Sequence, residues 1–254
     1  MSLKPSLRKF FSFLLIYFLL WVIFFEFVFP NGKILPQPGV VWQSFGALWF
    51  SYHILSNFLI TFAAIYVSLI VAFFAVKILS NHLINEKSFI KDFILSLNLF
   101  SEYVPGIVLA LFLIFWFPNS TFIEFVFTFL LIFFVLAKEV SNFSISKCKP
   151  YIDSARSFGL SESLINKKII WNCILPDLKD YILKKQIYFW SILIAFEIIK
   201  GNSGLGSVFG NALRFKDLSA TFAAALIVGI FVFVIIQVLS LFAKKFIHWS
   251  EVEL

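Results

Sequence analysis

Long, uninterrupted runs of apolar residues recur along this chain. Polar residues do not alternate with apolar ones inside them, as they do in the strands of membrane β-barrels. A helix needs about 20 apolar residues to cross the hydrocarbon core, and lipid offers the backbone no hydrogen bonds. The pattern therefore predicts an all-α integral membrane protein, a single domain over residues 1–254 with about six transmembrane helices. The predicted spans are residues 10–29, 58–79, 93–117, 122–137, 181–199 and 220–243.

Local features refine three of these spans. The third contains Pro105-Gly106, which predicts a kink because proline removes a helical hydrogen bond. The fifth carries Lys184, Lys185 and Glu197 near its ends, where long side chains can reach the membrane surface. The first exceeds the apolar core of a signal peptide, about 7–15 residues, so we expect it to remain as a membrane anchor.

The composition supports a membrane protein. Hydrophobic residues make up 61% of the chain and charged residues 14%, with a mean hydropathy of +0.95. A soluble domain has roughly 45–50% apolar and about 25% charged residues. These values exclude a soluble enzyme, a disordered chain and a disulfide scaffold.

The basic residues predict an orientation in the membrane. Of the 21 Lys and Arg residues, 17 lie at the two termini or in the second-to-third and fourth-to-fifth connections. Cytoplasmic loops carry an excess of Lys and Arg, so both termini and these connections are predicted to face the cytoplasm. Cys148 and Cys173 then lie in a reducing compartment, where we expect free thiols. The net charge of +7 is explained by orientation, and we expect no nucleic-acid partner.

The sequence shows no arrangement typical of an enzyme. The glycine-rich stretch from Gly201 to Gly206 lacks the G-K-[ST] ending of a P-loop and is interpreted as a turn after the fifth span. The two cysteines form no C-x-x-C pair and the histidines are scattered, so no metal site is predicted. There is no nucleophile-plus-base cluster and no buried carboxylate pair. We therefore expect a transport subunit without an ATPase site of its own and without a cofactor.

Several polar residues lie within or near the spans. Five glutamates fall near span ends, where they serve either as interface residues or in a substrate or proton role; the two interpretations stay open. The glutamates are Glu26, Glu102, Glu124, Glu139 and Glu197. The candidate pathway residues are Asn98, Glu102, Ser191 and Glu197.

The connection between the fourth and fifth spans, residues 138–180, is too long and too apolar for a plain loop. Ile152, Ala155 and Phe158 follow helical spacing, and Gly159 can adopt a positive φ and end a short helix. The pattern predicts a bent pair of short helices with basic flanks. They are either a membrane-surface amphipathic segment or a docking element for a cytoplasmic partner.

This connection resembles a known family motif. Asp153-Ser154-Ala155, three further residues and Gly159, then nine residues, Ile169, and Leu175-Pro176 are similar to the E-A-A-x3-G-x9-I-x-L-P loop. That loop marks the permease subunits of binding-protein-dependent ABC importers. The resemblance implies the fold of a type I importer permease, with a cytoplasmic coupling helix that seats in a groove of the ATPase subunit. It implies that these residues form the ATPase-coupling site, with either Arg156 or Lys168 adding a surface contact.

Other segments resemble the nitrate, sulfonate and taurine branch of that family. Residues 35–42 are similar to its L-P-S-P-x-x-V segment, residues 53–59 to its H-L-x-x-S-L, Pro105 with residues 115–117 to its P…L-W-F-G, and Glu197 with residues 203–206 to its A-E…S-G-L-G. The chain departs from the family at Asp153 and Ser154, which replace Glu and Ala. The first L-P of the branch falls at Trp171-Asn172.

The resemblance implies a set of partners in the inner, cytoplasmic membrane. These are two ABC ATPase subunits, an extracytoplasmic substrate-binding protein and a second permease copy, surrounded by membrane lipid. A small anion or small organic solute, such as sulfonate, taurine or nitrate, is the implied substrate. The branch implies a positive lining; the outer residues Lys200, Arg214 and Lys216 either form it or are solvated, and both interpretations stay open. The alternatives are a secondary transporter that works without ATP and a structural membrane anchor.

Overall fold

The computed structural model describes residues 4–28, 35–85, 88–104, 106–118, 120–143, 148–161 and 164–246. Within helices, the side chains of residues 4–11, 14, 101, 102, 166 and 246 lie outside that description. The described residues form helices joined by short connections. The helices are α1 (Lys4–Val22), η1 (Ile23–Val28), α2 (Pro38–Phe50), α3 (Ile54–Ile84), α4 (Phe89–Tyr103), α5 (Gly106–Trp116), α6 (Phe122–Ser141), α7 (Lys149–Ser157), η3 (Ile165–Ile170), α9 (Trp171–Lys200), α10 (Gly204–Arg214) and α11 (Leu218–Phe246).

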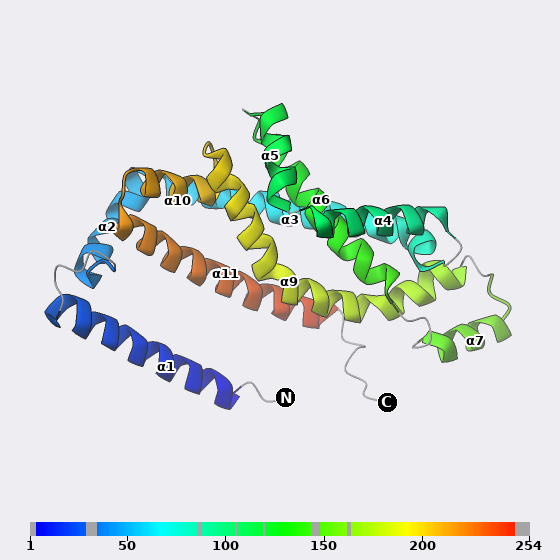
Figure 1. The fold of residues 1–254 in the computed structure, drawn as a ribbon. Helices are drawn as coiled ribbons and strands as arrows, with labels where there is room; N and C mark the ends of the chain where they lie inside the picture. The colour runs from blue at the N-terminus through cyan, green and yellow to red at the C-terminus, as the bar shows by residue number, and fades with distance from the viewer. Residues whose placement is uncertain are drawn as a thin grey trace.

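Each predicted span coincides with helical structure, but the third is divided. Its first part is α4 and its second is α5, and the two helices point in different directions (Figure 1). The predicted kink fell on Pro105-Gly106; Pro105 lies outside the described residues and Gly106 begins α5. By length and hydropathy, two of the described helices could cross a membrane, Ile54–Ile84 and Leu218–Lys245. The count of six spans stays a prediction.

Two helices, α2 and α10, were not predicted from the sequence. They have 13 and 11 residues, too few for a membrane-spanning run. Pro38 opens α2, because a proline at the first helical position lacks only an N–H that would be unpaired there. Pro36, Pro38 and Gly39 had indicated only a stiff turn.

The long helix α3 lies at the centre of the packing. It contacts α6 along its length and also contacts α9 and α10. Its buried face carries small residues four positions apart, Ala64, Ser68 and Ala72, which allow close approach of the two backbones. The Ser68 hydroxyl donates to the backbone carbonyl of Phe125 in α6 at 3.0 Å.

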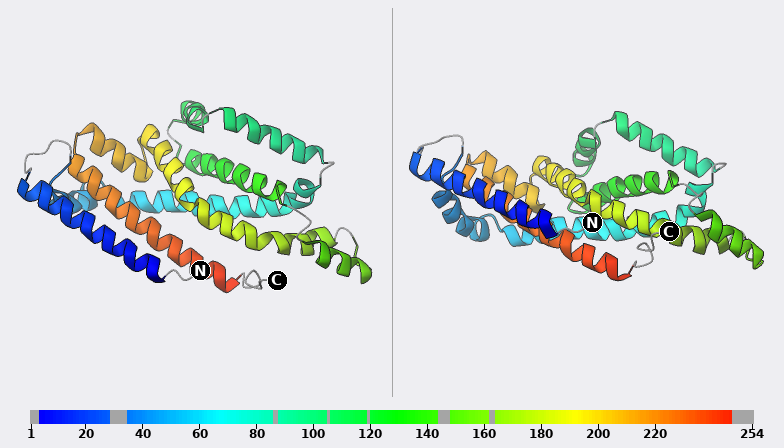
Figure 2. Two further views of the ribbon diagram at one scale, coloured as in Figure 1. Left: turned by 60° about the horizontal axis from the view of Figure 1, so that its bottom comes forward. Right: turned by 90° about the horizontal axis from the view of Figure 1, so that it is seen from below.

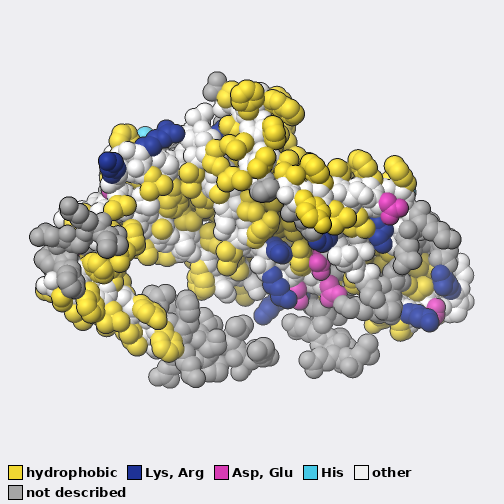
Figure 3. Space-filling model, in the orientation of Figure 1, with side chains coloured by type: hydrophobic (Ala, Val, Ile, Leu, Met, Phe, Trp, Pro, Cys, Tyr) yellow, Lys and Arg dark blue, Asp and Glu magenta, His cyan; other side chains and the backbone are white. Residues whose placement is uncertain are grey.

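The molecule is elongated. α2 and α10 lie at one end, and α7 extends from the other (Figures 1 and 2). Large apolar side chains cover much of the face drawn in Figure 3. Phe115 is 83% exposed and Ile78 is 77% exposed. Water-soluble monomers rarely expose apolar surface on this scale, so the surface fits a lipid environment.

Candidate functional site: a protruding helix and a buried polar network

The segment with the family-like motif forms α7 and a glycine cap. Gly159 has φ +76°, its N–H donates to the Arg156 carbonyl at 2.9 Å, and the Leu160 N–H donates to the Ala155 carbonyl at 3.2 Å. This pair of bonds is a Schellman motif, which needs a residue with positive φ. The prediction that Gly159 ends a short helix is confirmed.

One face of α7 packs inward and the other is open. Ile152 and Ala155 are buried, and α7 contacts η3 on that side. Asp153 and Ser154 are exposed, as is Arg156. Ala155, predicted to couple to the ATPase, is buried within the permease itself, and its role in coupling stays a prediction.

Phe158, which follows the helical spacing of Ile152 and Ala155, does not share their burial. Phe158 is 82% exposed. The helix ends at Ser157, and Phe158 is the residue that follows its last turn. Tyr151 is 56% exposed on the same short helix. Together, Tyr151, Asp153, Ser154, Arg156 and Phe158 form an exposed surface, here called the α7 surface.

The second short helix of the predicted pair is not separate. η3 runs directly into α9, so Ile169, Leu175 and Pro176 belong to one continuous helical segment, with all three partly buried. Trp171, at the position where the branch has its first L-P, is buried. Its ring packs edge-on against Phe73 of α3, with ring centroids 5.6 Å apart. The ring contact of Trp171 with Phe73 thus holds the start of α9 against α3.

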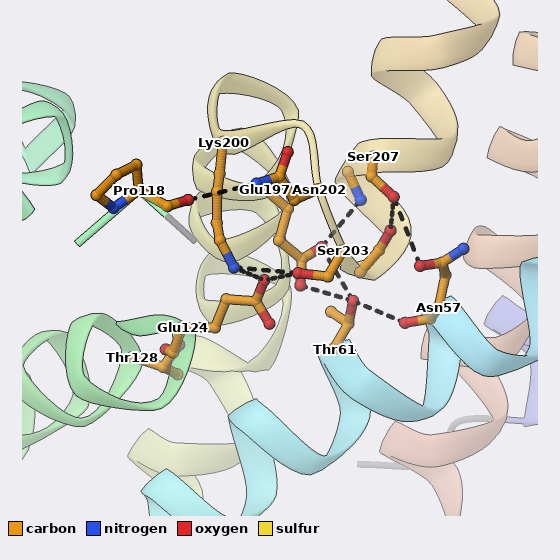
Figure 4. A network of polar contacts seen from close by, with 12 residues as sticks. Asn57, Thr61, Pro118, Glu124, Thr128, Glu197, Lys200, Asn202, Ser203 and Ser207 are labelled. Carbon is orange, nitrogen blue, oxygen red and sulfur yellow. Dashed lines mark hydrogen bonds and ion pairs between the residues drawn. The ribbon is translucent and has the colours of Figure 1, made fainter. Parts of the chain in front are cut away.

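At the other end of α9, a polar network is buried between four helices (Figure 4). Both oxygens of Glu197 lie within hydrogen-bond distance of the Thr61 hydroxyl, at 2.8 and 2.9 Å, and Oε2 accepts the Gly206 N–H at 2.9 Å. The Thr61 oxygen also accepts the Leu205 N–H at 2.8 Å. Glu197 thereby joins α9 to α3 and to the first turn of α10.

A buried ion pair continues the network. Lys200 Nζ lies 2.8 Å from Glu124 Oε1 in α6 and donates to the Ser203 hydroxyl oxygen at 3.1 Å. The Ser203 hydroxyl donates to the same Glu124 oxygen at 2.5 Å. Glu124 is 0% exposed, as is Glu197. We call Thr61, Glu124, Glu197, Lys200 and Ser203, with the backbone N–H groups of residues 205 and 206, the α10 network.

Two glycines make this arrangement fit. Gly204 has φ +78°, and a Cβ there would overlap the Glu197 carboxylate. A Cβ on Gly206 would overlap the Ile194 carbonyl oxygen of α9. Gly201, with φ +77°, ends α9, so a turn follows the fifth predicted span as expected, but it stops at Ser203 because Gly204 to Gly206 begin α10. The residues that resemble the A-E…S-G-L-G motif therefore have a structural relation: the backbone of residues 204–206 packs on the carboxylate of Glu197.

The structure changes two expectations about polar residues. Glu124 and Glu197 are carboxylates buried in one network, whereas the sequence indicated no such pair. Their nearness to the span ends hid this, because α10 and the turn before it fold back over them. Lys200 is bound to Glu124 and is buried, so it does not supply a positive lining; Arg214 and Lys216 are exposed. The sequence held one sign of this ion pair, because Glu124 and Lys200 lie at span ends on the same predicted side of the membrane.

The candidate pathway residues do not share one surface. Ser191 is exposed and its hydroxyl donates to the Ile187 carbonyl of its own helix, whereas Glu197 faces the opposite, buried side of α9. Asn98 is 6% exposed in α4. Glu102 is in α4, and its side chain lies outside the described part. Their role in a pathway stays a prediction.

A family model described as binding-protein-dependent transport system inner membrane component matches residues 78–248. The chain belongs to this family. The match spans α7, the continuous segment of η3 and α9, the α10 network apart from Thr61, and α11. Searches of curated proteins and of solved structures gave no match.

Family membership establishes the coarse function and setting. The protein is an inner-membrane permease component of a binding-protein-dependent ABC transporter. Such transporters also contain an ATPase and a binding protein.

Proposed function

We propose that this chain is the membrane-spanning permease subunit of an ATP-driven importer of the nitrate, sulfonate and taurine type. Two copies form the translocation pathway for a small anion or small organic solute. A separate ATPase drives the pathway through α7. The observation that carries this proposal is the exposed α7 surface. It lies beside η3, which continues into α9, so a partner bound there would contact an element packed on the body of the molecule.

The α7 surface has the chemistry of a docking element. Exposed aromatic residues, here Tyr151 and Phe158, bury large apolar area at low entropic cost when they enter a groove. Asp153 and Arg156 add exposed charged side chains on the same short helix. The rigid Schellman cap at Gly159 holds the surface in shape, which lowers the ordering cost of binding.

Family membership favours this function over a secondary transporter. A secondary transporter would be expected to use mid-membrane ionisable groups. The buried acids Glu124 and Glu197 are the closest counterparts, and both are held by hydrogen bonds or by Lys200.

The test uses the permease purified with the ATPase subunit of its own transport system. Phe158→Asp should weaken co-purification of the ATPase at least tenfold, because a buried aromatic anchor is typically worth more than about 1.4 kcal/mol. The matched control is Phe215→Asp, since Phe215 is 76% exposed just after α10, at the opposite end of the molecule. Equal loss of the ATPase in both variants, or in neither, would contradict docking at α7.

A further inference from the structure

One helical segment connects the α7 surface to the α10 network. η3 begins at Ile165, beside α7, and α9 ends at Lys200. At about 1.5 Å per residue, the 36 residues from Ile165 to Lys200 cover roughly 50 Å along the helix. Figure 1 shows that the segment turns part-way but is not interrupted. The last turn of α9 carries both Glu197 and Lys200.

The α10 network fastens α10 to that last turn. Glu197 binds the first turn of α10 through Gly206, and Lys200 binds Ser203, the residue before α10. The glycine contacts leave no free space between α10 and α9 at Gly206. Displacement of the end of α9 would therefore carry α10 with it.

Stability alone does not explain a buried ion pair. Removing two charges from water has a large desolvation cost, and well-packed apolar replacements are often neutral or stabilising. The Lys200–Glu124 pair, with Ser203 between its ends, instead fixes a direction and a distance between α9, α6 and α10. That is what a mechanical connection requires.

We propose that the α10 network makes α10 move together with α9, so that a displacement of α7 by the ATPase reaches the opposite end of the permease. Glu124, Glu197, Lys200 and Ser203 are positioning residues in this proposal. It rests on the proposed function, because the ATPase must act at α7. It adds a specific point of transmission that the function itself does not require.

The experiment measures ATP-dependent distances at both ends by spin labelling. Cys148→Ala and Cys173→Ser remove the two native thiols. Labels at Ser157→Cys report on α7, and labels at Leu213→Cys report on α10; both residues are exposed. Distances between the equivalent labels of the two copies are measured for the permease–ATPase complex in lipid nanodiscs, with and without ATP under conditions that block hydrolysis.

With the native network, ATP should shift both distances. In Glu124→Leu/Lys200→Met, the shift at Leu213→Cys should be clearly reduced, with only the Glu197–Gly206 hydrogen bond and the packing at Gly206 left to join α10 to α9, while the shift at Ser157→Cys persists. The matched control is Gln186→Leu, which removes a buried polar contact between α9 and Tyr66 of α3 away from the network, and should keep both shifts. Ser203→Ala is a smaller change and should reduce the α10 shift. This variant replaces the double variant in the experiment if the double variant does not fold.

An unchanged α10 shift in folded Glu124→Leu/Lys200→Met, or in Ser203→Ala if only that variant folds, overturns the proposal. Loss of both shifts in a folded variant also overturns it, since the network would then act on the whole fold. Failure of ATP to move the α7 labels in the native-network protein is a different result. It would refute the proposed function, and this proposal with it.

Discussion

At the residue scale, close contact decides the roles of the glycines. Gly206 lies against the backbone of α9 at Ile194 and Ile198, which cannot move aside as a flexible side chain would. Gly229 in α11 has open space where a Cβ would stand. The sequence places Gly206 in a glycine-rich stretch and Gly229 in an apolar run, but only the packing of α10 on α9 shows that Gly206 has no room for a side chain.

Gly206→Ala should lower the thermal unfolding temperature in detergent, because the added methyl group overpacks the contact at a cost of about 1–3 kcal/mol. The matched variant Gly229→Ala should leave that temperature unchanged or raise it, since alanine is favoured over glycine within helices by roughly 0.5–1 kcal/mol. The same loss in both variants would contradict the close approach of α10 and α9.

The sequence predicted the helix-ending role of Gly159, but it did not predict the burial of Glu124 and Glu197. A positive φ at a helix end is a local property, so the spacing of Ala155 and Gly159 was enough to indicate it. Burial of Glu124 and Glu197 depends on a fold-back of α10, which is a tertiary property.

At the element scale, the ends of α11 and α3 are linked by one carboxylate. Asp217 precedes α11, and its Oδ1 accepts the Ala220 N–H at 2.9 Å, which caps the first turn of the helix. Its Oδ2 accepts the Tyr52 hydroxyl at 3.5 Å, just before α3. Burial, followed by the charge of Asp217 and this hydrogen bond, raises the pKa of Tyr52.

Asp217→Ala should destabilise the protein by about 1 kcal/mol, because the N–H of Ala220 loses its capping acceptor. Asp217→Asn keeps a capping oxygen and should recover most of that loss. The comparison is made by thermal unfolding of the three proteins in the same detergent. An alanine variant as stable as the parent would show that the cap contributes nothing.

Helix positions followed well from the sequence where apolar runs were long. The runs at 58–79 and 220–243 became parts of α3 and α11, which are also the helices long and apolar enough to span a membrane. The short helices α2 and α10 were not predicted, because neither contains an apolar run long enough to span a membrane. Their stability comes from packing, α2 mainly on α11 and α10 on α9 and α3.

At the scale of the whole molecule, α7 lies at one end and α10 and α2 lie at the other (Figures 1 and 2). The distribution of Lys and Arg predicts that α7 faces the cytoplasm and α10 the opposite side. This orientation is a prediction that labelling can test.

In intact cells of a variant without its native cysteines, a membrane-impermeant maleimide should label Leu213→Cys and not Ser157→Cys. Permeabilised cells should show labelling of both, because both side chains are exposed. Labelling of Ser157→Cys from outside would place α7 on the wrong side of the membrane for an ATPase.

The central claim is that the ATPase binds at α7. The most direct measurement is photocrosslinking from a benzoylphenylalanine introduced at Phe158, in membranes that contain the permease and its ATPase subunit. We predict a crosslinked permease–ATPase product from this position and none from the same probe at Phe215. ATPase crosslinks from Phe215 but not from Phe158 would contradict the account.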